Sequence, residues 1–368
     1  MNYIIPFFIL ITVVVFIHEY GHYYFAKKYG VGITDFSIGF GKEIFGWNDK
    51  SGTRWKFCWI PLGGYVKFFG DRNVFSQAEQ ESIINQYNEN DRKKLFILKP
   101  LYQRSIIVAA GPLANFVLAL VIFTIINMVS GKDMTPAVIE EVQKDSPAYV
   151  AGMKKNDKII SIDKNEVVSI MEVSTFINTS TSDKIEFLVL RNNQEISFLI
   201  KPDLIDGKDS LGNSVKKRII GIRLSPFNNE FNRQPLGPSK AVYYSAKEVW
   251  FVTVTSLKYV GKMITGKGDS SQLGGPVRIA KITGQVAEYG IIPFFSIMAY
   301  ISISLGLINL FPIPMLDGGH LMFYFFEKVL GRPLRQKTQE SFFRIGLFLL
   351  FSLMFFVTFN DLKDLGLF

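Results

Sequence analysis

Two histidines lie four residues apart, at His18 and His22, in the stretch Tyr3–Phe25, which is otherwise almost entirely apolar. Residues four apart share one face of a helix, so both imidazoles can point at one metal ion. Glu19 lies one position further round the helix. Its carboxylate is placed to accept a proton from the attacking water rather than to bind the metal. These residue types at this spacing indicate metal-assisted hydrolysis, as in the HExxH pattern of zinc peptidases.

The apolar surroundings make this pattern more specific. Ionisable groups inside a membrane-length segment are costly and usually functional. The chain has only three histidines, and two of them are in this segment. The alternative is a pair of surface-facing helix histidines beside a capping glutamate, and the cost of placing charges in an apolar helix argues against it.

A catalytic zinc ion takes three protein ligands, so a third must come from another segment. The stretch Asn309–His320, NLFPIPMLDGGH, contains two candidates, Asp317 and His320. Its two prolines remove helix hydrogen bonds, and Gly318 and Gly319 are expected to let the backbone bend. On residue types alone, both candidates stay open.

The elements that must position these groups are membrane helices. The chain has 368 residues, 48% of them hydrophobic, and a mean hydropathy of +0.20, which predicts membrane spans combined with a sizeable soluble part. Four apolar segments qualify as spans, and the fourth can be extended through Phe342 and Phe343 if Arg344 snorkels. They are Tyr3–Phe25, Ser105–Val129, Ile291–Leu316 and Ile345–Phe359.

Charge predicts the orientation of these spans. The formal net charge is +9, and residues 27–104 contain 13 Lys or Arg against 8 Asp or Glu. We interpret this charge as a topology signal and not as nucleic-acid binding, since it clusters beside apolar spans. The positive-inside rule then predicts both termini outside the cytoplasm. On that topology, the polar groups of the first three spans converge on the cytoplasmic half of the bilayer.

Two further observations limit the possibilities. The amino terminus does not resemble a cleavable signal peptide, because it lacks a basic start and a small-x-small site and contains the metal motif. The single cysteine, Cys58, excludes an internal disulfide, and one Cys with three His excludes a zinc finger or ribbon.

Residues 39–69 alternate aromatic and polar side chains around a turn cluster, and then reach the pair Gly63-Gly64. This pattern predicts a β-hairpin. We interpret it as a re-entrant, membrane-associated hairpin whose edge can pair with an unwound substrate strand. An ordinary cytoplasmic hairpin is the alternative. Residues 70–95 are predicted to form a polar surface loop with a helix.

Residues 134–226 read as a small α/β module with strands at Lys158–Ile162, Ile185–Leu190 and Ile196–Ile200. The last two are joined at Asn192-Asn193, a hairpin signal. The pattern resembles a bacterial PDZ domain, which captures peptide ends by strand addition and a backbone carboxylate site. We expect that site near residues 219–222. The stretch 235–290 that follows is predicted to be amphipathic.

The sequence resembles the site-2 protease family of intramembrane zinc metalloproteases, nearest its bacterial RseP-like branch (regulator of sigma-E protease). The motifs that carry this resemblance are HEYGH in the first span, GPLAN in the second span, the PDZ-like module, and NLFPIPMLDGGH in the third span. The resemblance covers nearly the whole chain. It implies that His18, His22 and Asp317 bind Zn²⁺ and that Glu19 is the catalytic base, with His320 not a ligand. It also assigns Asn309 to holding the substrate backbone or the developing oxyanion. We predict that Asn115, Gly63 and Gly64 contact the substrate as well. Some family members carry two PDZ modules in tandem, whereas only one fits here.

The resemblance implies hydrolysis of peptide bonds within transmembrane helices of single-span proteins, such as an anti-sigma factor or remnant signal peptides. Other expected partners are the lipid bilayer and peptide termini at the PDZ-like domain, with no nucleic acid. The expected location is the bacterial inner membrane, with the termini and PDZ-like domain periplasmic and the active site towards the cytoplasm. The expected fold is a multi-pass α-helical membrane protein with about four transmembrane helices, a membrane-associated β-hairpin and one inserted extracytoplasmic PDZ-like α/β domain. The expected segments are 1–27, 28–104, 105–129, 130–230, 231–290, 291–317, 318–342 and 343–360, of which 318–342 is a cytoplasmic loop.

Three alternative functions fit the sequence less well. Other membrane HExxH peptidases cleave soluble or loop segments and take a glutamate from a later helix as third ligand, and no such intramembrane glutamate is present. A catalytically idle scaffold that presents the PDZ-like module would not need Glu19. A transporter would usually show repeated halves, and we see no internal repeat.

Overall fold

The computed structural model describes residues 3–70, 87–208, 214–226, 232–266 and 274–364. The chain divides into two compact units, which are described separately. Unit 1 contains residues 1–122 and 270–368, and unit 2 contains residues 123–269. Unit 1 contains every residue of the predicted metal site.

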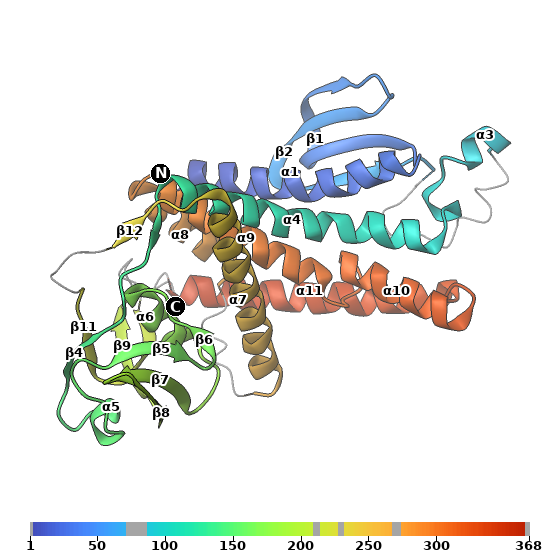
Figure 1. The fold of residues 1–368 in the computed structure, drawn as a ribbon. Helices are drawn as coiled ribbons and strands as arrows, with labels where there is room; N and C mark the ends of the chain where they lie inside the picture. The colour runs from blue at the N-terminus through green and yellow to red at the C-terminus, as the bar shows by residue number, and fades with distance from the viewer. Residues whose placement is uncertain (1–2, 71–86, 209–213, 227–231, 267–273, 365–368) are drawn as a thin grey trace. The chain divides into compact units, whose positions relative to one another are not determined.

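Unit 1 is built on four helices that are long and apolar enough to cross a membrane. They are α1 (Ile4–Lys28), α4 (Leu101–Val129), α9 (Ile291–Leu310) and α11 (Gln336–Asp364), and the shorter helices are α8 (Pro276–Glu288) and α10 (Asp317–Leu330). Helix α11 begins nine residues before the predicted apolar core at Ile345, so Arg344 lies within the helix. In Figure 1 the long helices run in roughly the same direction, and the N-terminal strands lie on one face of α1.

Helix α10 corrects one expectation. Residues 318–342 were predicted to be a loop, whereas 318–330 are helical and α11 begins at residue 336. The sequence places Phe323 and Tyr324 on the buried side of α10, and Gly331, at φ +67°, ends the helix in the left-handed conformation. This amphipathic pattern explains why a helix forms within the predicted loop.

Glycines bring the helices of unit 1 into backbone contact. A Cβ atom at Gly21 on α1 would lie 2.8 Å from the carbonyl carbon of Ala110 on α4. At Gly306 on α9, it would lie 2.9 Å from the carbonyl oxygen of Pro112 on α4. Small residues allow such close approach in membrane helix bundles. Helix α4 therefore approaches both α1 and α9 closely near the HExxH motif.

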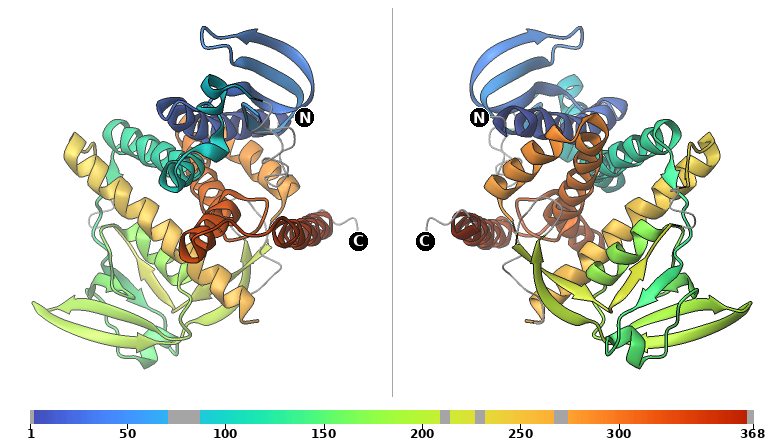
Figure 2. Two further views of the ribbon diagram at one scale, coloured as in Figure 1. Left: turned by 90° about the vertical axis from the view of Figure 1, so that its right-hand side faces the viewer. Right: turned by 90° about the vertical axis from the view of Figure 1, so that its left-hand side faces the viewer.

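Strands β1 (Ile33–Asn48) and β2 (Arg54–Phe68) form the predicted hairpin, which begins six residues before residue 39. Both strands fold back on themselves. Phe36 pairs with Val66 on one side and with Trp55 on the other, and Trp55 also pairs with Trp47. Gly39 and Gly41, both at φ +88°, allow the sharp bend in β1. The result is a compact sheet that lies along α1 (Figure 2).

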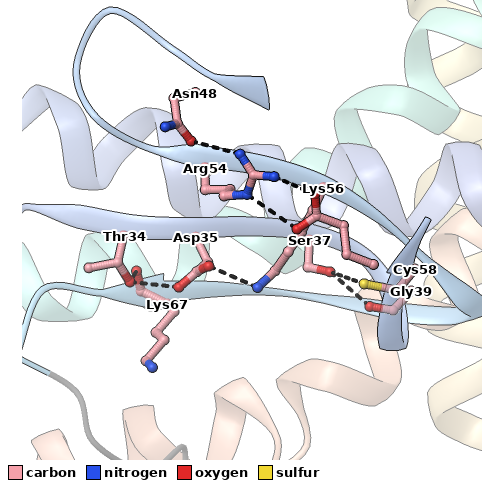
Figure 3. Close-up of polar contacts among 10 residues, drawn as sticks. Thr34, Asp35, Ser37, Gly39, Asn48, Arg54, Lys56, Cys58 and Lys67 are labelled. Carbon is pink, nitrogen blue, oxygen red and sulfur yellow. Dashed lines mark hydrogen bonds and ion pairs between the residues drawn. The ribbon is translucent and has the colours of Figure 1, made fainter. Parts of the chain in front are cut away.

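Polar contacts lock this sheet. Lys56 donates a 2.8 Å hydrogen bond to Asp35 (Figure 3). Arg54 binds Glu43 through two guanidinium nitrogens. Burial alone would lower the pKa of the Lys56 ammonium, but its contacts with Asp35 and Tyr65 raise that pKa. Both ion pairs join strand β1 to strand β2.

The turn of the hairpin is fixed to α1. Asp49 accepts hydrogen bonds from the Tyr23 hydroxyl at 2.9 Å and from the Trp55 indole at 3.1 Å. It also accepts the backbone N–H groups of Ser51 and Thr53. Burial alone would raise the pKa of the Asp49 carboxyl, but these donors hold it well below its usual range. Since Tyr23 follows His22 directly, the metal-motif helix and the sheet are joined next to the site.

Unit 2 contains the predicted α/β module. Its four-stranded sheet has the order β6-β5-β7-β8, and strands β5, β7 and β8 match the three predicted strands. Asn192 and Asn193, at φ +50° and +59°, form the predicted turn. The sheet strands are β5 (Lys158–Ile162), β6 (Asn165–Glu166), β7 (Ile185–Arg191) and β8 (Gln194–Ile200).

Short strand pairs and helices complete unit 2. Residues 219–222, where the carboxylate site was expected, join β10 to β11 through Gly221 at φ +75°. The elements are β3 (Lys132–Asp133), β4 (Ile139–Val142), α5 (Pro147–Val150), α6 (Ile170–Thr179), β9 (Asp203–Lys208), β10 (Ser214–Ile219), β11 (Ile222–Leu224), β12 (Arg233–Gln234) and α7 (Pro238–Ile264). The amphipathic stretch predicted over 235–290 is thus helical in α7 and α8. In the predicted loop 70–95, residues 71–86 lie outside the described residues, and α3 (Glu89–Arg92) forms a short helix, followed by the 3-10 helix η1 (Phe96–Leu98).

Candidate metal centre

Three side chains from distant parts of the chain meet in unit 1. The ligand atoms of His18, His22 and Asp317 lie within 4.8 Å of one another. The two imidazole Nε2 atoms are 3.3 Å apart. Asp317 places one oxygen 3.2 Å from His18 Nε2 and the other 3.5 Å from His22 Nε2. All three side chains are at least four-fifths shielded from solvent, so the group is compact and enclosed.

Helix α1 supplies both imidazoles, and helix α4 orients one of them. The Nδ1 atom of His22 lies 2.9 Å from the carbonyl oxygen of Ile107. A carbonyl can only accept, so Nδ1 carries the proton and Nε2 keeps its lone pair. That tautomer is the one a metal ligand needs.

Glycine on α4 makes room for the same imidazole. A Cβ atom at Gly111 would lie 2.5 Å from Cε1 and 2.8 Å from Cδ2 of His22, and closer still to Nε2. Any side chain at this position would therefore occupy the space of the ring. Gly111 opens the GPLAN motif of the second apolar segment, so this motif builds one wall of the site.

The break after α9 positions Asp317. Helix α9 ends at Leu310, and Met315 adopts a left-handed conformation at φ +91° before α10 begins at Asp317. Gly318 and Gly319 were expected to bend the backbone, but both are helical with ordinary φ. A Cβ atom at Gly318 would overlap the carbonyl oxygens of residues 310 and 311, and one at Gly319 would lie 2.7 Å from Pro314 Cα. These glycines therefore serve close packing of α10 on the turn, which fixes the carboxylate.

The structure brings Asp317 to the two imidazoles and does not bring His320. Among the described residues, the group that can hold a metal ion contains only Asp317 as its third member. The His320 ring instead lies 5.9 Å, between ring centroids, from the ring of Phe343 on α11. The two candidates left open by the residue types are therefore separated by geometry.

Glu19 lies on α1 beside the three ligands, against β2. A Cβ atom at Gly64 would lie 3.0 Å from Glu19 Cγ, so the absence of a side chain at Gly64 leaves room for the glutamate. The carboxylate also interacts with the backbone of Val66. Gly63, at φ +155°, packs on the ring of Phe40.

The two asparagines of the predicted substrate-binding set differ in position. Asn309 is half-buried, one residue before α9 ends. Asn115 on α4 is fully buried, and its amide nitrogen lies 3.2 Å from His18 Nδ1. Its amide therefore lies next to a candidate ligand imidazole, and its role in substrate binding stays a prediction. Reasoning from the sequence also missed Gly111 and the Ile107 carbonyl, although glycine at helical spacing before Asn115 was the visible signal for the first.

The donor set fits zinc. Two imidazole nitrogens and one carboxylate oxygen match a catalytic zinc site that leaves a fourth position open. The tautomer of His22 directs its Nε2 lone pair towards the group, and Gly111 leaves room for that ring. No fourth His, Cys, Asp or Glu joins the group among the described residues. A metal centre of this composition beside a glutamate, on helices able to cross a membrane, defines the class of membrane metallopeptidases.

Comparison with known proteins agrees with this class. The model of peptidase family M50 matches residues 6–353. A protein of Agrobacterium fabrum named as a zinc metalloprotease is 39% identical over 364 residues, covering 99% of this chain and 96% of that protein. Metalloprotease MmpA of Caulobacter vibrioides is 35% identical over 380 residues, covering 98% of this chain and 95% of that protein.

The chain therefore belongs to peptidase family M50, the site-2 protease family, and it is a zinc metalloprotease. The family match spans both units. A solved PDZ domain of an SdrC-like protein from Listeria monocytogenes matches this chain with 24% sequence identity and a TM-score of 0.20. The match covers 25% of this chain and 90% of that domain.

Proposed function

We propose that this metalloprotease hydrolyses peptide bonds within transmembrane helices of single-span membrane proteins. The observation that carries the proposal is the depth of the ligands in apolar helices. His18 is 14 residues after the start of α1 at Ile4, about 21 Å along the helix axis and well inside a hydrocarbon layer of about 30 Å. A peptide bond that reaches this site must itself enter the bilayer.

In this proposal, His18, His22 and Asp317 hold the zinc ion. When bound there, zinc polarises the scissile carbonyl and acidifies the attacking water. Glu19 accepts a proton from that water and returns it to the leaving amine. Asn309 holds the substrate backbone or the developing oxyanion through its amide.

The substrate must be extended where it is cut, because a helix hides its carbonyls in its own hydrogen bonds. The segment Gly64–Phe68 of β2 supports a strand-addition model. Among the described residues, this segment pairs with β1 on one side only, and Gly64 lies against Glu19. A substrate strand added here would run past the catalytic glutamate. Gly63 would keep the approach to this edge free of side chains.

The proposed topology follows from charge. Both termini and unit 2 lie in the periplasm, and the metal site lies towards the cytoplasmic side of the bacterial inner membrane. Unit 2 would bind peptide termini and exclude substrates whose outer part is still bulky. An anti-sigma factor and remnant signal peptides are the substrates that we propose.

A glutamate substitution tests this function. The variant Glu19→Gln should retain zinc while cleavage of a single-span model substrate in detergent falls by about 10²–10⁴-fold. The matched control is Glu288→Gln, because Glu288 is an exposed residue at the end of α8. Mass spectrometry should place the cut inside the apolar segment of the substrate. Undiminished cleavage by Glu19→Gln, or a cut outside that segment, would refute the proposal.

A further inference from the structure

The buried amide of Asn115 has an unusual set of neighbours. Its nitrogen lies 3.2 Å from His18 Nδ1, and its oxygen is buried with no hydrogen-bond partner among the described residues. Two nitrogens can share a hydrogen bond only if one of them carries a lone pair. With the amide in this orientation, Nδ1 must be the acceptor, and the proton of a neutral His18 then lies on Nε2.

That tautomer is incompatible with metal binding at His18. The Nε2 atom is the one that lies 3.2 Å from Asp317 and 3.3 Å from His22 Nε2, so it must keep its lone pair for the zinc ion. The proton then moves to Nδ1, which needs an acceptor in a fully buried position. A half-turn of the Asn115 amide exchanges its two end atoms and presents the unpaired oxygen to Nδ1. One amide atom stays unpaired in either orientation, so the imidazole decides between them.

We propose that Asn115 is a positioning residue that accepts the Nδ1 proton of His18 when zinc is bound. The inference rests on His18 being a zinc ligand. Asn115 thereby does for His18 what the Ile107 carbonyl does for His22. Both acceptors come from α4, eight residues apart, so one helix sets the tautomers of both imidazoles.

Two contacts from α9 reach the backbone and the Cβ of Asn115, and neither involves its side-chain amide. The hydroxyl of Ser302 donates a 2.9 Å hydrogen bond to the backbone carbonyl oxygen of Asn115, and both residues are fully buried. A Cβ atom at Gly306 would lie 3.2 Å from Asn115 Cβ, so α9 packs directly on this residue.

The test measures zinc affinity and not cleavage, so it is independent of the proposed substrate. The dissociation constant is determined by chelator competition on the full chain in detergent, together with the midpoint of thermal unfolding of the zinc-free protein. Asn115→Leu keeps the size of the side chain and removes both polar atoms. Loss of an outer-shell partner weakens metal binding by about 10–100-fold, and we expect a change in that range.

Two variants separate hydrogen bonding from packing. Asn115→Asp restores an acceptor and should bind zinc within about threefold of the unmodified protein. Ser302→Ala disturbs the same junction without touching the amide, and should lower thermal stability while leaving zinc affinity within about threefold. If Asn115→Leu does not fold, Asn115→Ala replaces it.

Three results would overturn the proposal. They are unchanged zinc affinity in the apolar variant, no rescue by Asn115→Asp, or an equal loss of affinity in Ser302→Ala. If Asp317→Ala also retained zinc, the proposed ligand set itself would be wrong, which is a separate failure.

Discussion

A single methyl group at residue 111 should disrupt the metal site. In Gly111→Ala, the new Cβ would lie 2.5 Å from Cε1 of His22, whereas ordinary van der Waals contact begins near 3.4 Å. The imidazole must therefore retreat by about 1 Å. It is held by its hydrogen bond to Ile107, so it cannot move without losing that acceptor. Misplacement by about 1 Å costs on the order of 10²-fold in catalysis, and we expect zinc affinity to fall as well.

Gly261→Ala is the matched control. Gly261 lies inside helix α7 in unit 2, and a Cβ atom there would meet no atom within 4 Å. The substitution should leave zinc binding unchanged and stabilise the helix by about 0.5–1 kcal/mol. Zinc content after dialysis, the zinc dissociation constant and cleavage of a model substrate are measured for both variants. Wild-type zinc affinity and activity in Gly111→Ala would refute our account of how α4 shapes the site.

Three further predictions concern stability, measured as thermal unfolding in detergent. Asp361 on α11 accepts hydrogen bonds from the backbone N–H groups of Gly275, Val277 and Arg278 at the start of α8. Asp361→Ala should therefore lower the free energy of unfolding by about 2–3 kcal/mol, and Asp361→Asn should lower it less. Equal stability of the two variants would contradict this capping role. Arg104 binds Glu327 on α10 in a largely buried ion pair. Arg104→Met should therefore lower the free energy of unfolding by about 3–5 kcal/mol, whereas the double variant Arg104→Met with Glu327→Met should lower it less. A double variant less stable than the single variant would refute this prediction. The pKa of the Asp49 carboxyl is lowered on folding, so its contribution is present above the unfolded value of 3.8 and is lost as pH falls below it. Asp49→Asn should lower the free energy of unfolding at pH 7 by about 1 kcal/mol and should remove the loss of stability that Asp49 causes at acid pH. An unchanged dependence of stability on pH in this variant would contradict the prediction.

The chemistry was predictable because it depends on residue type and spacing. His18 and His22 share a helix face whatever the rest of the fold does, and the apolar segment around them raises the significance of each charge. The strands of unit 2 were predictable for the same reason, since alternation and the Asn192-Asn193 turn act locally.

Tertiary contacts were not predictable in this way. Residue types left Asp317 and His320 equally available, and only the packing of α10 on the preceding turn separates them. Gly318 and Gly319 suggested a flexible backbone, whereas close approach to residues 310–314 explains them better. Within the loop predicted over 318–342, α10 forms a helix whose Phe323 and Tyr324 are buried by tertiary packing.

Asn115 shows a second limit of sequence reasoning. An asparagine in an apolar helix predicts a polar function, but the residue type does not say whether it faces substrate or a neighbouring side chain. Its distance to His18 Nδ1 decides this, and that distance depends on how α1, α4 and α9 cross.

The central claim is that two imidazoles from α1 and the carboxylate at the start of α10 hold one zinc ion. Zinc content of purified Asp317→Ala and His320→Ala, measured by elemental analysis after identical dialysis, tests it most directly. We predict that Asp317→Ala loses its zinc and that His320→Ala retains about one ion per chain. Zinc retained by Asp317→Ala and lost by His320→Ala would contradict the account.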